Sequence, residues 1–117
     1  METGLPQEFM AGSRTYRLVP FNEPDKPSVN HHTMLEQGHR EQASMGEEHG
    51  QHILKCWRQL PPEYRDHQIV LVFPEWRGSP GHIACLFWFG HELRLYWTPL
   101  KNEWEANFYL VRFIASA

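Results

Sequence analysis

Three side chains of types that commonly bind zinc follow one another closely in segment 49–56. His49 and His52 are three residues apart, and Cys56 follows four residues later. On a continuous helix this spacing places them on one face, and imidazole nitrogen and thiolate sulfur are preferred zinc ligands. The pattern predicts a metal site with His49, His52 and Cys56 as ligands and zinc as the cofactor. The fourth ligand would be His39, His82 or His91.

A structural interpretation of the same segment competes with the metal site. Ile53, Trp57 and Leu60 recur at helical spacing and predict an apolar helix face. Cys56 would pack beside them as a small apolar side chain, and the two histidines would flank this face in solvent. The chain also lacks the C-x-x-C pair that is typical of structural zinc sites. In this interpretation the protein needs no cofactor.

A second chemical hypothesis is a cysteine hydrolase with Cys56 as nucleophile and His82 as base. Segments 55–57 (KCW) and 81–85 (GHIAC) resemble the cysteine and histidine neighbourhoods of viral leader cysteine proteinases. The resemblance implies a papain-type Cys…His pair. In such enzymes a helix N-terminus lowers the pKa of the thiol. Cys56 instead falls near the C-terminal end of its expected helix, where the helix dipole opposes thiolate formation.

Residues 61–64 (PPEY) match the PPxY motif that binds WW domains. Such segments are recognised in an extended polyproline conformation, which requires that the motif be exposed. The two prolines also end a helix and begin a turn, which this part of the sequence requires in any case. We favour the second interpretation.

The elements expected to position these residues define an α+β fold. Alternating or continuous apolar runs predict four strands, at 68–73, 82–89, 92–98 and 104–114, joined by short turns into an antiparallel meander over about 68–114. A main helix at about 51–60, which could begin at 34, packs on one face of this sheet. A short strand is expected at 14–19.

Composition divides the 117-residue chain unevenly. The first fifty residues carry eight Asp and Glu against four Lys and Arg, and all five tryptophans come later. We therefore expect residues 1–32 to be partly disordered and 33–117 to form one α+β domain. The net charge of −3 argues against nucleic-acid binding, and no apolar run is long enough to span a membrane. Two cysteines and no signal peptide favour a cytoplasmic location.

Aromatic side chains are too numerous for one sheet face and one helix to bury. Strands that are apolar on both faces need a second cover, which could be the N-terminal segment, a second copy or another protein. Tryptophan and tyrosine are also common anchors of protein interfaces. The candidate partner-binding residues are Trp76, Trp88, Tyr96, Trp97, Trp104 and Tyr109.

The leading hypothesis is therefore a small, non-enzymatic protein–protein interaction module. It would act as an inhibitor or accessory protein through an aromatic-rich sheet face or edge, and it would form a homodimer or bind another protein. The zinc-stabilised domain and the cysteine hydrolase are the alternatives.

Overall fold

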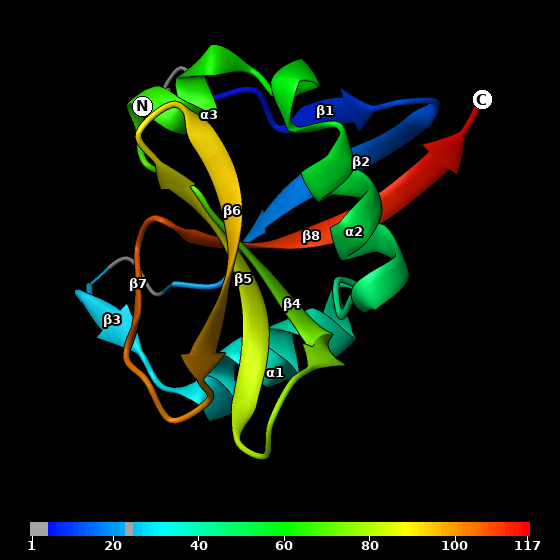
Figure 1. The fold of residues 1–117 in the computed structure, drawn as a ribbon. Helices are drawn as coiled ribbons and strands as arrows, with labels where there is room; N and C mark the ends of the chain where they lie inside the picture. The colour runs from blue at the N-terminus through cyan, green and yellow to red at the C-terminus, as the bar shows by residue number, and fades with distance from the viewer. Residues whose placement is uncertain (1–4, 23–24) are drawn as a thin grey trace.

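The computed structural model describes residues 5–22 and 25–117 and is built around a six-stranded sheet (Figure 1). The strand order is β1-β2-β8-β4-β5-β6. These strands are β1 (Glu8–Ala11), β2 (Arg14–Pro20), β4 (Val70–Arg77), β5 (His82–Phe89), β6 (Glu92–Pro99) and β8 (Phe108–Ser116). A separate antiparallel pair is formed by β3 (Ser28–Val29) and β7 (Trp104–Glu105). The expected α+β class is confirmed.

Only part of the sheet is the expected meander. β4, β5 and β6 pair in sequence through antiparallel hairpins. β8 then leaves β6, crosses the sheet, and pairs in parallel with β4 and antiparallel with β2. The prediction of a four-stranded meander was therefore wrong for its last strand. Leu110 and Val111 point to opposite faces and are both fully buried, which requires a central position in the sheet.

The N-terminal part of the chain contributes directly to this sheet. The strand expected at 14–19 is present as β2, and β1 precedes it in a tight hairpin. The described part of segment 1–32 therefore contributes two strands of the large sheet and one of the small pair. Partial disorder was expected for residues 1–32, and residues 1–4 and 23–24 of this range lie outside the described residues.

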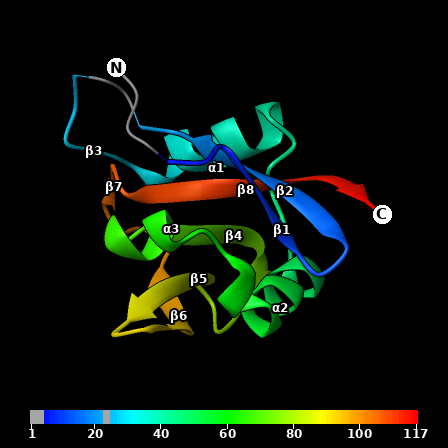
Figure 2. The same cartoon turned by 90° about the horizontal axis from the view of Figure 1, so that it is seen from above.

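Helices cover both faces of the sheet, as the view from above shows (Figure 2). On one face lies α1 (His31–Arg40), whose Met34 packs with Val72 and Leu110. On the other face lie α2 (Glu47–Lys55), the short 3₁₀ helix η1 (Trp57–Gln59) and α3 (Pro62–Asp66). None of the helices in the described ranges has the length and apolar character needed to cross a membrane.

The helical region differs from the expected single helix, which was placed at 51–60 with an alternative start at 34. It is divided into α1 and α2, and residues 41–46 separate them. The Oδ1 of Asn30 caps α1 by accepting a hydrogen bond of 3.0 Å from the Thr33 N–H. Gly46 is the N-cap of α2, whereas Gly50 lies inside α2 and does not interrupt it. Gly50 is buried against the indole of Trp76, and this contact explains a glycine in a helix interior.

Candidate functional site

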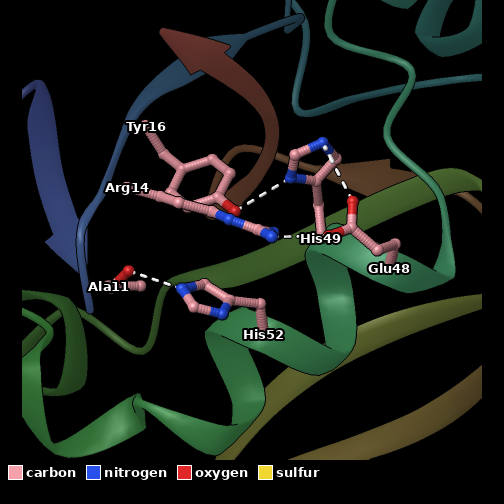
Figure 3. A network of polar contacts seen from close by, with 6 residues as sticks. All are labelled: Ala11, Arg14, Tyr16, Glu48, His49 and His52. Carbon is pink, nitrogen blue, oxygen red and sulfur yellow. Dashed lines mark hydrogen bonds and ion pairs between the residues drawn. The ribbon is translucent and has the colours of Figure 1, made fainter. Parts of the chain in front are cut away.

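The first half of α2 faces the β1–β2 hairpin through a network of polar side chains (Figure 3). The hydroxyl of Tyr16 and the Nδ1 of His49 are 2.9 Å apart and form a hydrogen bond. Arg14 forms an ion pair of 2.6 Å with Glu48, and His49 Nε2 lies 3.6 Å from the same carboxylate. Phe113 of β8 lies against the ring of His49, with 4.9 Å between the ring centroids. Alternation along β2 directs Tyr16 inward, where it is fully buried.

Burial and charge together determine how these groups ionise. Burial lowers the pKa of His49, against the opposing effect of Glu48. Burial likewise raises the pKa of Tyr16. Interactions with Tyr16 and Glu48 raise the pKa of Arg14, and the hydrogen bond from Arg14 lowers the pKa of Glu48. Near neutral pH the network therefore consists of one ion pair beside a neutral tyrosine–histidine pair.

The predicted zinc ligands are engaged in separate contacts. His52 Nε2 lies 2.6 Å from the carbonyl oxygen of Ala11, so this nitrogen carries a proton and donates it. His49 uses its Nδ1 for Tyr16. Over the described residues, no three His, Cys, Asp or Glu side chains form a group that could hold a metal ion. The predicted site at His49, His52 and Cys56 is therefore not supported, and His39, His82 and His91 complete no such group.

An open cavity of about 540 Å³ adjoins this network. Its lining consists of Arg14, Glu48, Gln51, His52, Leu54 and Lys55. The charge of Arg14 is already balanced by Glu48, and the lining contains no cysteine, serine or threonine that could act as a nucleophile. These contacts join α2 to the β1–β2 hairpin.

The two residues of the proposed hydrolase pair are not brought together. Cys56 ends α2, and its neighbour Trp57 contacts Trp88 near the end of β5, with 6.2 Å between ring centroids. His82 begins β5, six residues before Trp88, which corresponds to about 20 Å along an extended strand. His82 Nδ1 contacts the carbonyl of Pro80 at 3.3 Å. The other cysteine, Cys85, is buried, and its burial raises the thiol pKa to about 12.

The PPEY segment is not an exposed WW ligand in this fold. Pro62 begins α3, so the segment is helical from its second proline, and Tyr64 is fully buried. The Tyr64 hydroxyl donates a hydrogen bond of 2.7 Å to the carbonyl oxygen of Pro6. The expected helix stop is present, since η1 ends at Gln59, but a new short helix, α3, follows where a turn was expected.

The six candidate partner-binding residues divide into three groups. Trp76 and Trp104 are part of the core, since they are 4% and 0% exposed. Trp88 and Tyr109 are partly buried against the hydrophobic core that lies between the sheet and the helices α2 and α3. Tyr96 and Trp97 are exposed on β6, at 60% and 39%. The surface offered by the predicted residues is therefore limited to the region of β6.

β6 forms one edge of the sheet and is the longer of its two edge strands. It pairs with β5 over eight consecutive residues without a bulge, and no described strand lies on its other side. The opposite edge, β1, has only four residues. An edge strand exposes backbone donors and acceptors that another strand could pair with.

Sequence reasoning left the most exposed aromatic side chain near this edge out of the candidate residues. Phe89, the last residue of β5, is 67% exposed, and the guanidinium of Arg94 lies 4.8 Å from its ring centroid. Its position beside the Gly90 turn was the available signal, because a strand end next to a turn is seldom covered. Phe89, Tyr96 and Trp97 together with the strand β6 are called the β6 surface below.

Comparisons with protein-family models, with curated proteins and with solved structures found no match.

Proposed function

We propose that this protein is a non-enzymatic interaction module that binds an extended segment of another protein along β6. The observation that carries the proposal is the unpaired eight-residue edge of β6, bordered by exposed aromatic side chains. Such an edge binds a partner by strand addition, in which main-chain hydrogen bonds give affinity and alternate side chains give specificity.

The two faces of the sheet next to β6 supply different contacts. Tyr96 lies on the α1 side, where its ring meets Phe87 with 5.4 Å between centroids. Trp97 lies on the α2 side, where it packs on Gly78 and meets Trp76 at 5.9 Å. An added strand would therefore place its alternate side chains against one aromatic surface on each face.

β6 also lacks most of the features that keep edge strands of natural proteins from pairing with other chains. Natural edges are blunted by bulges, lysines, inward-facing charges or short length. β6 has no lysine and no bulge against β5, and its two charged residues, Glu92 and Arg94, pair with each other at 3.0 Å. Pro99 ends the strand and is the one protective feature.

The test is selection of extended peptides from a displayed random dodecapeptide library, followed by NMR mapping of a selected synthetic peptide on the ¹⁵N-labelled protein. We expect the largest amide shifts along Glu92–Thr98 of β6. The double variant Phe89→Lys with Tyr96→Lys should abolish binding. The matched control is Met10→Lys with Ile114→Lys, which changes two exposed apolar residues far from β6 and should bind normally. Absence of selected binders, or shifts at β1 instead, would refute the proposal.

A further inference from the structure

A second cavity lies where the end of β5 meets η1 and α3. Its volume is about 170 Å³. The indoles of Trp57 and Trp88 meet there nearly at right angles, with an interplanar angle of 78°. The complete lining is Trp57, Arg58, Leu60, Pro61, Pro62, Arg65, Trp88 and His91. This site is called the tryptophan pocket below.

The lining of the tryptophan pocket combines the two indoles with the cationic side chains of Arg58 and Arg65. The guanidinium of Arg58 lies 5.0 Å from the ring centroid of Trp57, and no described carboxylate lies within ion-pair distance of Arg58. Arg65 has only a loose contact with Asp66, at 3.8 Å between nitrogen and oxygen. No acidic residue lines the pocket, although the whole chain carries a net charge of −3. The local charge is therefore complementary to an acidic ligand.

The size of the pocket indicates what part of a ligand it could take. Pockets that enclose a whole drug-sized ligand have volumes of about 300–1,000 Å³. At about 170 Å³, the tryptophan pocket has room for a single side chain that belongs to a larger partner. The two tryptophans are partly buried, and tryptophan and arginine are the residue types that often dominate the binding energy of protein interfaces.

The position of the pocket connects it to the β6 surface. Trp88 is paired with Leu93, the second residue of β6, and His91 lies in the turn between the two strands. The pocket therefore lies at the end of the β5–β6 hairpin where β6 begins, so an extended segment paired with β6 would have one end near it.

We infer that the tryptophan pocket binds an apolar side chain of an acidic extended peptide. Carboxylates next to that side chain would accept hydrogen bonds from Arg58 and Arg65, and the apolar group would pack against the two indoles. This inference rests on the proposed function, because it states the chemistry of the segment that β6 would bind.

The test uses two synthetic hexapeptides that differ only in charge. One is acetyl-Thr-Asp-Phe-Asp-Val-Thr-amide, and the other replaces both aspartates by lysine. Titration of the ¹⁵N-labelled protein at low salt follows the indole N–H signals. We expect the acidic peptide to shift the signals of Trp57 and Trp88, and to leave that of Trp104 unchanged. Trp104 serves as the internal control, because its indole N–H donates to the carbonyl of Leu100 inside the core.

Substitution of the two arginines that line the tryptophan pocket tests whether binding requires their positive charge. Arg58→Glu with Arg65→Glu should weaken acidic-peptide binding about tenfold, which corresponds to about 1.4 kcal/mol. The control is Arg17→Glu with Arg40→Glu, which makes the same change in net charge at two exposed arginines on β2 and α1 and should bind normally.

Two readouts in the same spectra separate this inference from the proposed function. Shifts of the β6 amides without shifts of the Trp57 and Trp88 indoles would overturn the pocket and leave strand addition intact. Indole shifts without β6 shifts would support the pocket and count against strand addition. Equal binding of the lysine peptide would refute the charge requirement. A shift of the same indoles by adenosine monophosphate, with none by the acidic peptide, would assign the pocket to nucleotides and overturn the inference.

Discussion

The indole of Trp76 lies against the backbone of Gly50, in the middle of α2. A methyl group at position 50 would overlap the six-membered ring of this indole and approach Phe73 to 3.5 Å. The absence of a side chain at Gly50 therefore determines how closely α2 approaches β4.

Substitution of Gly50 by alanine should destabilise the protein by about 1–3 kcal/mol, the usual effect of overpacking a core. This is the opposite of the gain of about 1 kcal/mol that alanine brings to an unhindered helix interior. The measurement is the free energy of unfolding from urea titration. The control is Gln51→Ala, an exposed neighbour on the same helix, which should stay within about 0.5 kcal/mol of the native value. An unchanged or increased stability of the Gly50 variant would contradict the packing described here.

Removal of the Tyr16 hydroxyl should also destabilise the fold. Tyr16→Phe keeps the buried ring but deprives the Nδ1 of His49 of its partner, at an expected cost of about 1–2 kcal/mol. Tyr96→Phe removes a hydroxyl from an exposed ring and should have little effect. Equal stability of both variants would show that the Tyr16–His49 hydrogen bond contributes nothing.

Stability should fall as the pH is lowered below the ordinary histidine pKa of about 6.5. Burial lowers the pKa of His49 in the folded state, so the unfolded chain binds a proton more readily than the folded protein does. The contribution of neutral His49 is thus fully present above pH 6.5 and is lost as the pH falls toward its folded pKa. Urea titrations at pH 7.5, 6.5 and 5.5 measure how the free energy of unfolding changes with pH.

The variant His49→Gln should be less stable overall but should show a flatter dependence on pH. His31 also has a lowered pKa because of burial, so His31→Gln is the comparison that separates the two histidines. Glu48 has a lowered pKa as well, but it titrates below this pH range. A slope that is unchanged in His49→Gln would assign the pH dependence to other groups.

The two thiols should differ sharply in reactivity. Cys85 is fully buried and its pKa is raised to about 12, so it should not react with Ellman's reagent in the native protein. Cys56 is partly exposed and should account for the whole native reaction, whereas both thiols should react in guanidinium chloride. Cys56→Ser should then abolish the native reaction. A reaction of Cys85 in the native protein would show that β5 opens.

The parts of the fold that the sequence predicted are those with a strong local pattern. β5 was expected at 82–89 and spans His82–Phe89, because an apolar run between turn residues has few other interpretations. β6 and β2 agree with their expected ranges to within one residue. The parallel pairing of β8 with β4 could not be located in the same way, since strand order depends on contacts distant in sequence. The adjacent apolar residues Leu110 and Val111, both fully buried in the structure, were nevertheless a usable sign that β8 is central.

The site was predicted less well than the fold, for a physical reason. Spacing along a helix specifies which side chains share a face, but not which partners the rest of the chain brings to them. His49 and His52 do lie close in the sequence, yet Tyr16 and the carbonyl of Ala11 occupy their ring nitrogens. In the same way, the aromatic count predicted an exposed surface, but it could not separate the buried Trp104 from the exposed Tyr96.

The central place of β8 has a consequence for how this protein is made. β8 leaves the ribosome after every other strand of the sheet, yet it alone joins the β1–β2 hairpin to the β4–β5–β6 meander. Until it emerges, these two pieces have no strand between them, and both sides of the gap expose unpaired backbone. Contacts so distant in sequence form slowly. Completion of the sheet is therefore a late event, dependent on the last residues of this segment to be translated.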